Sequence, residues 1–367
     1  MDNSVAAYPA RFFMGANTPD GFVAYLDDIY ERNGDWRAFL IKGGAGTGKA
    51  SLMRRVLTHM NERGTESRVL ICSSDPDSID AVIFPNLKVC IIDATAPHII
   101  EPKYWGAVEQ IVDISSCMDA QTMHAEADKI IAATDANTAL HVRVRRFMGT
   151  AAALLGDTRR MAEQHTETGK IIRTAARIAA REFLPPTEQT GRRQRLFLSA
   201  VTPAGFITLF GTVQALCPRI YAIEDEYGAS AGILIGELCS RAIEAGHNVI
   251  SCADPLFPSE GPQHLLIPSL GLGFVTSNFW HKVDFPVFRR IHAMRFTNTD
   301  ALRSCKPLMS FNRRACRELI GEAVSISQEA KRLHDQMEAL NRVHVNWDGV
   351  NALTEGILAQ FDKIIGT

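Results

Sequence analysis

The sequence predicts an α/β protein built from two tandem copies of one parallel-sheet core, each followed by a helical extension. Short apolar runs alternate with helical patterns, as expected for a parallel sheet covered on both faces. Alanine-rich and charge-rich helical segments follow at about 122–184 and 310–367. The second half of the chain also repeats the first at a nearly constant offset, which indicates a duplication.

The repeat consists of matched segments that lie 182 to 184 positions apart. The matched pairs are 18–22 with 202–206, 38–41 with 220–223, Gly64 with Gly246, and 83–87 with 266–270. The predicted organisation is a first copy at 1–184, a linker at 185–194 and a second copy at 195–367. The first copy has a core at 11–118 and a helical hairpin at 122–184, and the second has a core at 195–300 and a helical part at 310–367.

Within the first copy, residues 18–33 are predicted to form a helix, because Thr18 is a capping residue and Pro19 suits the first helical position. Strands are predicted at 37–42, 68–72 and 87–93, with a shorter apolar piece at 82–84. A further helix is predicted to run from the loop after the first of these strands to about Arg63, where Gly64 ends it. In the helical segment, breaks are expected near Gly149 and Gly156.

A glycine-rich loop joins the first predicted strand to the next helix. Its residues are Gly43, Gly44, Ala45, Gly46, Thr47, Gly48, Lys49, Ala50 and Ser51. The first seven complete the Walker A pattern G-x-x-x-x-G-K, in which backbone amides converge on a polyphosphate at a helix N-terminus. Lys49 is expected to reach the β- and γ-phosphates. The alternative is a strand-to-helix turn without a ligand.

The loop departs from the pattern at one position. A Walker A motif continues with Ser or Thr, whose hydroxyl binds Mg²⁺, whereas this chain has Ala50. Ser51 is rotated by about 100° around the helix and does not replace that hydroxyl directly. Nucleotide binding is therefore predicted, whereas efficient Mg²⁺-dependent hydrolysis is in doubt.

The second copy lacks a comparable loop. Where the first copy has residues 42–49, the second has Glu224-Asp225-Glu226-Tyr227-Gly228-Ala229-Ser230-Ala231. Three carboxylates would repel a polyphosphate, and there is no lysine. The second copy is predicted to be degenerate, with a structural or regulatory role.

Two further segments are expected at the carboxyl ends of strands, where open α/β sheets bind ligands. Asp93 ends an apolar strand in the manner of a Walker B motif and is the candidate Mg²⁺ ligand, with an ordinary strand-end aspartate as the alternative. His98 follows in the next loop and is a candidate for phosphate contact or proton transfer. Ser73, Ser74 and Asp75 follow another strand, and Asp75 is a candidate for orienting a water or an acceptor substrate.

Composition narrows the functional classes. The formal net charge of −2 gives no general reason to bind nucleic acid or an anionic membrane. No apolar run approaches the roughly 20 residues of a membrane span, and the acidic N-terminus lacks a signal-peptide core. A cytoplasmic protein is expected. The eight cysteines form no C-x-x-C pair, which argues against a zinc site or a disulfide framework.

The Walker A residues 43–49, the segment 72–75 and the segment 93–98, in a duplicated chain of this length, resemble a bacterial family of tandem P-loop proteins named only as ATP-binding proteins or putative ATPases. The resemblance covers nearly the full length. It implies P-loop NTPase folds in both halves and ATP at residues 43–51, but it supplies no reaction. Ala50 and the second loop depart from the family's pattern.

The sequence thus leaves three functions open. The first is ATP binding in the first copy with slow or partner-dependent hydrolysis, in which Lys49, Asp93, Asp75 and His98 are the candidate catalytic residues. The second is a small-molecule or nucleotide kinase with an acceptor near Ser73. The third is a nucleotide-gated scaffold without turnover, in which ATP binding biases how the two halves pack. A protein partner or a homo-oligomer is also left open. ATP is favoured over GTP because no guanine-specifying N-K-x-D tetrapeptide is present.

Overall fold

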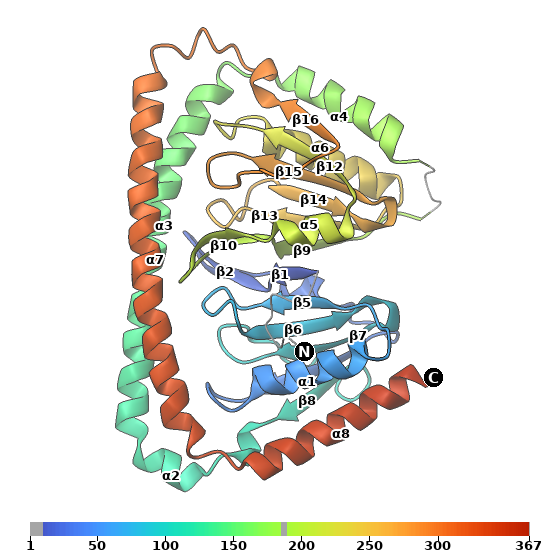
Figure 1. The fold of residues 1–367 in the computed structure, drawn as a ribbon, viewed down its shortest axis with the longest axis vertical. Helices are drawn as coiled ribbons and strands as arrows, with labels where there is room; N and C mark the ends of the chain where they lie inside the picture. Colours follow the sequence, from blue (N-terminus) through green and yellow to red (C-terminus); the bar gives the residue numbers. More distant parts are fainter. Residues whose placement is uncertain (1–9, 185–188, 367) are drawn as a thin grey trace. The chain divides into compact units, whose positions relative to one another are not determined.

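The computed structural model describes residues 10–184 and 189–366 and shows an α/β protein (Figure 1). These residues divide into two compact units. Unit 1 holds Ala24–Arg143, the chain from Ser325 onward, and its start up to Gly15. Unit 2 holds Ala16–Val23 and Val144–Val324. The α/β class predicted from the sequence is confirmed.

Unit 1 contributes six sheet strands, in the order β1-β5-β6-β7-β4-β8. Its strands are β1 (Arg11–Phe13), β4 (Arg37–Lys42), β5 (Arg68–Ile71), β6 (Ile79–Phe84), β7 (Val89–Asp93) and β8 (Glu109–Asp113). Its helices are α1 (Lys49–Asn61), α2 (Ala120–Ala125), α8 (Trp347–Ile365) and parts of the long helices α3 (Ala127–Glu163) and α7 (Lys306–Arg342).

Unit 2 also contributes six sheet strands, in the order β9-β13-β14-β15-β12-β16. Its strands are β9 (Arg193–Phe197), β12 (Arg219–Glu224), β13 (Val249–Ala253), β14 (His264–Ile267), β15 (Leu272–Ser277) and β16 (Arg289–His292). Its helices are α4 (Thr168–Glu182), α5 (Phe210–Leu216), α6 (Ala231–Glu244) and the remaining parts of α3 and α7.

The two sets of six strands share one topology. Matched strands occupy the same places in both orders, and the pairs within each set are parallel except those made by β6 in unit 1 and β14 in unit 2. The antiparallel strand follows from short connections, since β6 joins β7 through the single 3-10 turn Pro85–Leu87. A connection of that length permits only antiparallel pairing, whereas parallel neighbours require a crossover.

The helix predicted at 18–33 is wrong. The structure has a hairpin there, made of β2 (Gly15–Thr18) and β3 (Gly21–Ala24), followed by a short 3-10 helix at Leu26–Asp28. The Thr18 hydroxyl accepts from the Asp20 amide and donates to the Gly21 carbonyl, and Gly21 has φ 127°. A side chain that hydrogen-bonds locally favours a turn as readily as a helix cap.

The second copy repeats this hairpin in detail. Strands β10 (Ser199–Thr202) and β11 (Gly205–Thr208) pair in antiparallel fashion. The Thr202 hydroxyl donates to the Gly205 carbonyl and accepts from the Ala204 amide, at 2.9 and 3.1 Å. The turn chemistry of the first copy is therefore preserved in the second.

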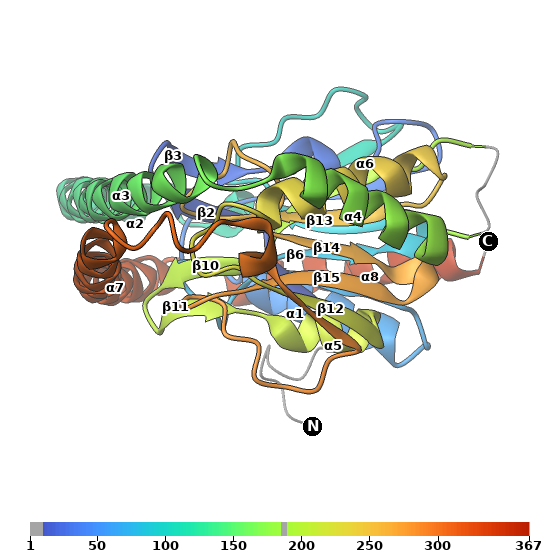
Figure 2. The same cartoon turned by 90° about the horizontal axis from the view of Figure 1, so that it is seen from above.

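The helical segments differ from the predicted hairpin at 122–184. Helix α3 is 37 residues long and continues through Gly149 and Gly156, since a glycine inside a helix costs only about 1 kcal/mol. In unit 2 the partner of α3 is α7, another 37-residue helix (Figures 1 and 2). The Asn312 amide of α7 donates to the Leu154 carbonyl and the Thr158 hydroxyl of α3.

The compact units also cross the predicted domain boundary. Helix α4 follows the first core in sequence but packs on α6 of unit 2 (Figure 2). Helix α8 ends the chain but packs on α1 of unit 1 (Figure 1). Each core is thus covered by a helix from the other half of the sequence. Of the predicted linker, residues 185–188 lie outside the described residues, and β9 begins at Arg193.

The two covering helices, α4 and α8, bury residues at the same spacing. Residues 171, 175, 178 and 182 of α4 correspond to residues 350, 354, 357 and 361 of α8. In α8, Phe361 is fully buried and stacks on Phe39 with ring centroids 4.9 Å apart. In α4, Glu182 is buried at the equivalent place and accepts a 2.6 Å hydrogen bond from the Tyr221 hydroxyl. An aromatic pair in unit 1 is therefore a hydrogen-bonded polar pair in unit 2.

Candidate functional site

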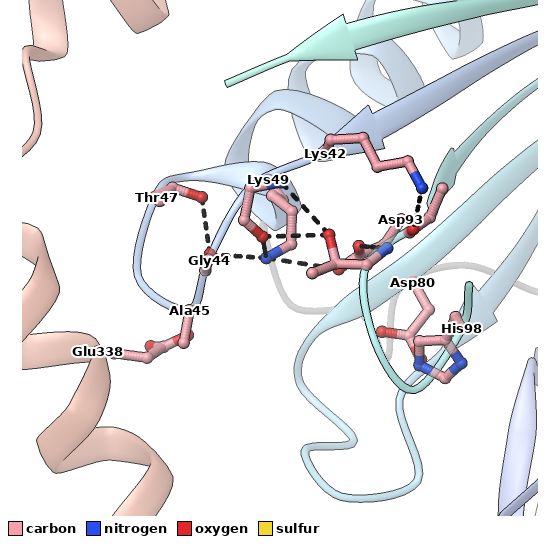
Figure 3. A network of polar contacts seen from close by, with 12 residues as sticks. Lys42, Gly44, Ala45, Thr47, Lys49, Asp80, Asp93, His98 and Glu338 are labelled. Atoms are coloured by element: carbon pink, nitrogen blue, oxygen red, sulfur yellow. Dashed lines mark hydrogen bonds and ion pairs between the residues drawn. The ribbon is translucent and has the colours of Figure 1, made fainter. Parts of the chain in front are cut away.

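The glycine loop lies between β4 and α1 in unit 1, as the sequence predicts (Figure 3). Two of its glycines have left-handed backbones, Gly46 with φ 75° and Gly48 with φ 93°, and only glycine adopts these values without strain. Thr47 is buried, and its hydroxyl donates to the Gly44 carbonyl at 2.8 Å. The loop is thereby held as a compact turn at the start of α1.

Lys49 lies across this turn (Figure 3). Its ammonium donates to the carbonyls of Gly43 and Gly44, both at 2.7 Å, and its Nζ lies 3.6 Å from Oδ2 of Asp93. Lys49 and Asp93 are thus brought together, as expected of a Walker A lysine and a strand-end acid. An ammonium has three donors; two of them are used in these hydrogen bonds, and the contact with Asp93 is an ion pair.

Asp93 ends β7, and its Oδ1 accepts the Thr95 amide at 2.9 Å. Burial raises the pKa of Asp93, the Lys49 ammonium opposes that shift, and the charge of Asp80 adds to it. The Thr95 hydroxyl also donates to the Gly43 carbonyl, which ties the β7 loop to the glycine loop. Asp93 is therefore a mostly buried carboxyl next to the candidate phosphate position.

Asp80 is a site residue that the sequence reasoning missed. It lies in β6 and is 5% exposed, and its Oδ2 is 3.3 Å from Nε2 of His98, which is equally buried. The signal was an acidic residue inside the otherwise apolar strand Ile79–Phe84. His98, predicted to contact phosphate, therefore lies against this carboxylate instead (Figure 3).

Asp75 is placed beside helix α7. Its Oδ2 is 3.5 Å from Nζ of Lys331, and burial raises the pKa of Asp75 while Lys331 opposes that shift. Ser73 is buried, and its hydroxyl is among the buried polar groups that have no hydrogen-bond partner within residues 10–184 and 189–366. Ser74 is half-buried in the same loop. This segment thus offers one unpaired hydroxyl and one carboxyl that is already in an ion pair.

The end of α7 and the start of α8 cover the outside of the glycine loop, a feature that no local pattern indicated. The Asn341 amide donates to the Ala45 carbonyl at 3.0 Å. A Cβ on Gly46 would lie 2.5 Å from the Glu338 carbonyl oxygen, and one on Gly48 would lie 3.2 Å from the Trp347 ring. These partners are almost 300 residues away in sequence, so only the folded chain shows them.

The predicted Mg²⁺ position offers few protein ligands. Ala50 carries no hydroxyl, and Ser51 is exposed on α1. Within the described part of the chain, no group of three or more His, Cys, Asp and Glu side chains is arranged to hold a metal. Asp93 is the one predicted metal ligand beside Lys49. A metal here would depend on phosphate oxygens and water for most of its ligands.

In the equivalent loop of unit 2, a carboxylate of the loop itself occupies the position between the backbone amides. The Asp225 carboxylate accepts hydrogen bonds from four backbone amides, all of residues that follow it in the chain. These are Tyr227 at 3.3 Å, Gly228 at 3.0 Å, Ser230 at 2.8 Å and Ala231 at 2.7 Å. Gly228 has φ 75°, the same value as Gly46. The loop has thus kept a ring of inward-facing amides and filled it with a side chain.

Comparison of the chain with protein-family models, with curated proteins and with solved structures found no match. The helices in residues 10–184 and 189–366 include none with the length and apolar character of a membrane span.

The buried carboxyl of Asp93 gives a pH prediction. Because its folded pKa is raised, the folded protein holds this proton at pH values where the unfolded chain, with a pKa near 3.9, has lost it. Stability is therefore expected to fall as the pH rises from about 4 through the folded pKa of Asp93.

The variant Asp93→Asn tests this prediction, because it keeps an acceptor for the Thr95 amide and removes the loss of stability. Urea unfolding at pH 4 and pH 7 should show the variant gaining on the wild type only at the higher pH. An equal difference at both pH values would contradict the prediction.

Proposed function

We propose that unit 1 is a P-loop NTPase-like core that binds ATP at residues 43–51, with slow or partner-dependent hydrolysis. The observation that carries the proposal is the position of Lys49, which begins α1, spans the loop carbonyls and lies 3.6 Å from Asp93. A cation, a helix N-terminus and left-handed glycines together suit a polyphosphate. On binding, the γ-phosphate takes the place of Asp93 as the partner of Lys49.

The proposed roles follow from the contacts. The loop amides hold the phosphates, Lys49 offsets their charge, and Asp93 holds Mg²⁺ directly or through water. Asp75 and His98 act less directly, since Asp75 pairs with Lys331 and the His98 ring already lies 3.3 Å from Asp80.

Thermal unfolding tests this proposal. ATP at 100 times its Kd is expected to add about 2.7 kcal/mol of stability, which is a shift of several degrees in Tm. Lys49→Ala is expected to abolish the shift, whereas Lys129→Ala, which removes an exposed lysine on α3, should retain it. Scans with ATP, ADP and GTP, each with and without Mg²⁺, would establish nucleotide preference and metal dependence. The proposal fails if no nucleotide stabilises the wild-type protein.

A non-catalytic nucleotide switch is the second candidate, and two observations favour it. Ala50 removes a Mg²⁺ ligand, and α7 and α8 pack directly on the loop through Asn341 and Trp347. A nucleotide that reshapes the loop would change this packing without turnover.

Restoring the missing hydroxyl separates the two candidates. If the site is a weakened ATPase, Ala50→Ser is expected to raise the hydrolysis rate at least about tenfold, which corresponds to about 1.4 kcal/mol of barrier. Ala136→Ser is the matched control and should leave the rate unchanged, because Ala136 is exposed on α3, outside the loop. Steady-state phosphate release measures both. An unchanged rate in Ala50→Ser, with ATP still bound, would support the switch.

A further inference from the structure

Unit 2 contains a cavity of about 410 Å³ beside its filled loop. Its walls include Gly228 of that loop, Asp254 after β13, and Thr276 near the end of β15. The cavity therefore lies at the carboxyl ends of the strands, where open α/β sheets bind ligands. Its volume is within the range of about 300–1,000 Å³ typical of small-molecule sites.

The loop next to this cavity cannot hold a polyphosphate. Asp225 is 3% exposed and already accepts the amides that a phosphate would need. Glu226 and Glu260 also line the cavity, and their carboxylates pair with Arg313 and Arg159. The charged groups at the rim thus largely neutralise one another, and a ligand of the cavity does not need a high charge.

The remaining wall combines aromatic surface with two polar groups that lack a full set of partners. Phe257, Phe279 and Trp280 line the cavity. The Trp280 indole N–H is buried and is among the groups without a hydrogen-bond partner in the described residues. Asp254 uses Oδ1 to accept the Leu256 amide, and burial raises the pKa of its carboxyl to about 6, which leaves it mainly an acceptor at pH 7.

We infer that this cavity binds a phosphate-free planar nitrogen heterocycle of nucleobase or nucleoside size. A ring of that kind can pack against the aromatic wall, donate N–H groups to Asp254 and offer an acceptor to the Trp280 indole. The second copy has in this way lost a phosphate site and retained a small-molecule site. This inference does not depend on ATP binding in unit 1.

Gly232 gives a selective way to block the cavity. It lies in the first turn of α6 and lines the cavity, and a Cβ built on it meets no atom within 4 Å. Gly232→Phe is therefore expected to fill the cavity without a backbone clash. Gly232→Ala is the matched control, since it adds one methyl group and leaves most of the volume open.

The experiment uses the full chain carrying Lys49→Ala, so that binding at the glycine loop of unit 1 does not contribute to the signal. Adenosine, guanosine, cytidine and uridine are titrated by calorimetry, and circular dichroism checks that each variant is folded. At least one nucleoside is expected to bind. Gly232→Phe should abolish that binding, Gly232→Ala should retain it, and Asp254→Asn should weaken it at least about tenfold.

Three results would overturn the inference. The first is that none of the four nucleosides binds at about 1 mM, a concentration that would detect even a weak Kd. The second is binding that persists in folded Gly232→Phe, which would place the ligand elsewhere. The third is a triphosphate that binds this cavity more tightly than its nucleoside. Loss of ATP-induced stabilisation in Lys49→Ala bears only on unit 1, so the two proposals fail separately.

Discussion

Replacing Asp225 with alanine is expected to destabilise unit 2 by about 3–5 kcal/mol. The carboxylate accepts four backbone amides at the start of α6, and a hydrogen bond to a charged group contributes about 1.5–3 kcal/mol. Some of these amides will regain water, so the effect is smaller than the full sum. Urea unfolding followed by circular dichroism measures it.

Glu226→Ala is the control for that variant. Glu226 is the next residue, but it is exposed and pairs with Arg313 on the surface, so its loss is expected to cost less than about 1 kcal/mol. A second test is chemical rescue. Sulfate should stabilise Asp225→Gly more than the wild type, because the glycine variant leaves the amides open to an external anion. Equal effects of the two alanine variants would show that the four hydrogen bonds are not important for stability.

Replacing Gly46 with alanine is expected to cost about 2–5 kcal/mol and to abolish nucleotide binding. The left-handed backbone alone costs roughly 1–2 kcal/mol for an L-residue. The new Cβ would lie 2.5 Å from the Glu338 carbonyl oxygen and 2.9 Å from its Cα. Backbone atoms cannot rotate away, so either the loop or α7 must move, as in an overpacked core.

Gly64→Ala isolates the backbone contribution. Gly64 has the same φ of 75°, but a Cβ there meets nothing within 4 Å. Its substitution is expected to cost only the left-handed strain, about 1–2 kcal/mol, and to leave nucleotide binding intact. Thermal unfolding with and without ATP measures both variants. If Gly46→Ala were no worse than Gly64→Ala, the contact with α7 would not constrain the loop.

Local patterns were sufficient to predict the strand, loop and helix around Lys49. Apolar runs identify buried strands, and the glycines mark a backbone that other residues avoid. The same reasoning failed at Thr18, because a capping threonine before proline has the chemistry of a tight turn as well as that of a helix start. Thr202 forms the same turn in the second half of the chain.

The contacts between segments far apart in the chain could not be predicted from the sequence. An amphipathic stripe shows that α4 and α8 each bury one face, but it does not say against which helix. The exchange of covering helices between the halves could not be predicted for this reason. The role of Asp225 was also missed. The three carboxylates predict a loop unsuited to phosphate, but the pattern could not show that one of them occupies the ring of amides.

The position of α8 has a consequence for biosynthesis. Phe361 packs on Phe39 and Phe84, and it belongs to the last helix of the chain. While the ribosome still holds Trp347–Ile365, the core of unit 1 lacks this cover, although all six of its strands have already emerged. Unit 2 has α4 available before β9, the first of its six sheet strands, is made. The strands that are synthesised first are therefore covered last, and their apolar face stays uncovered for longer during translation.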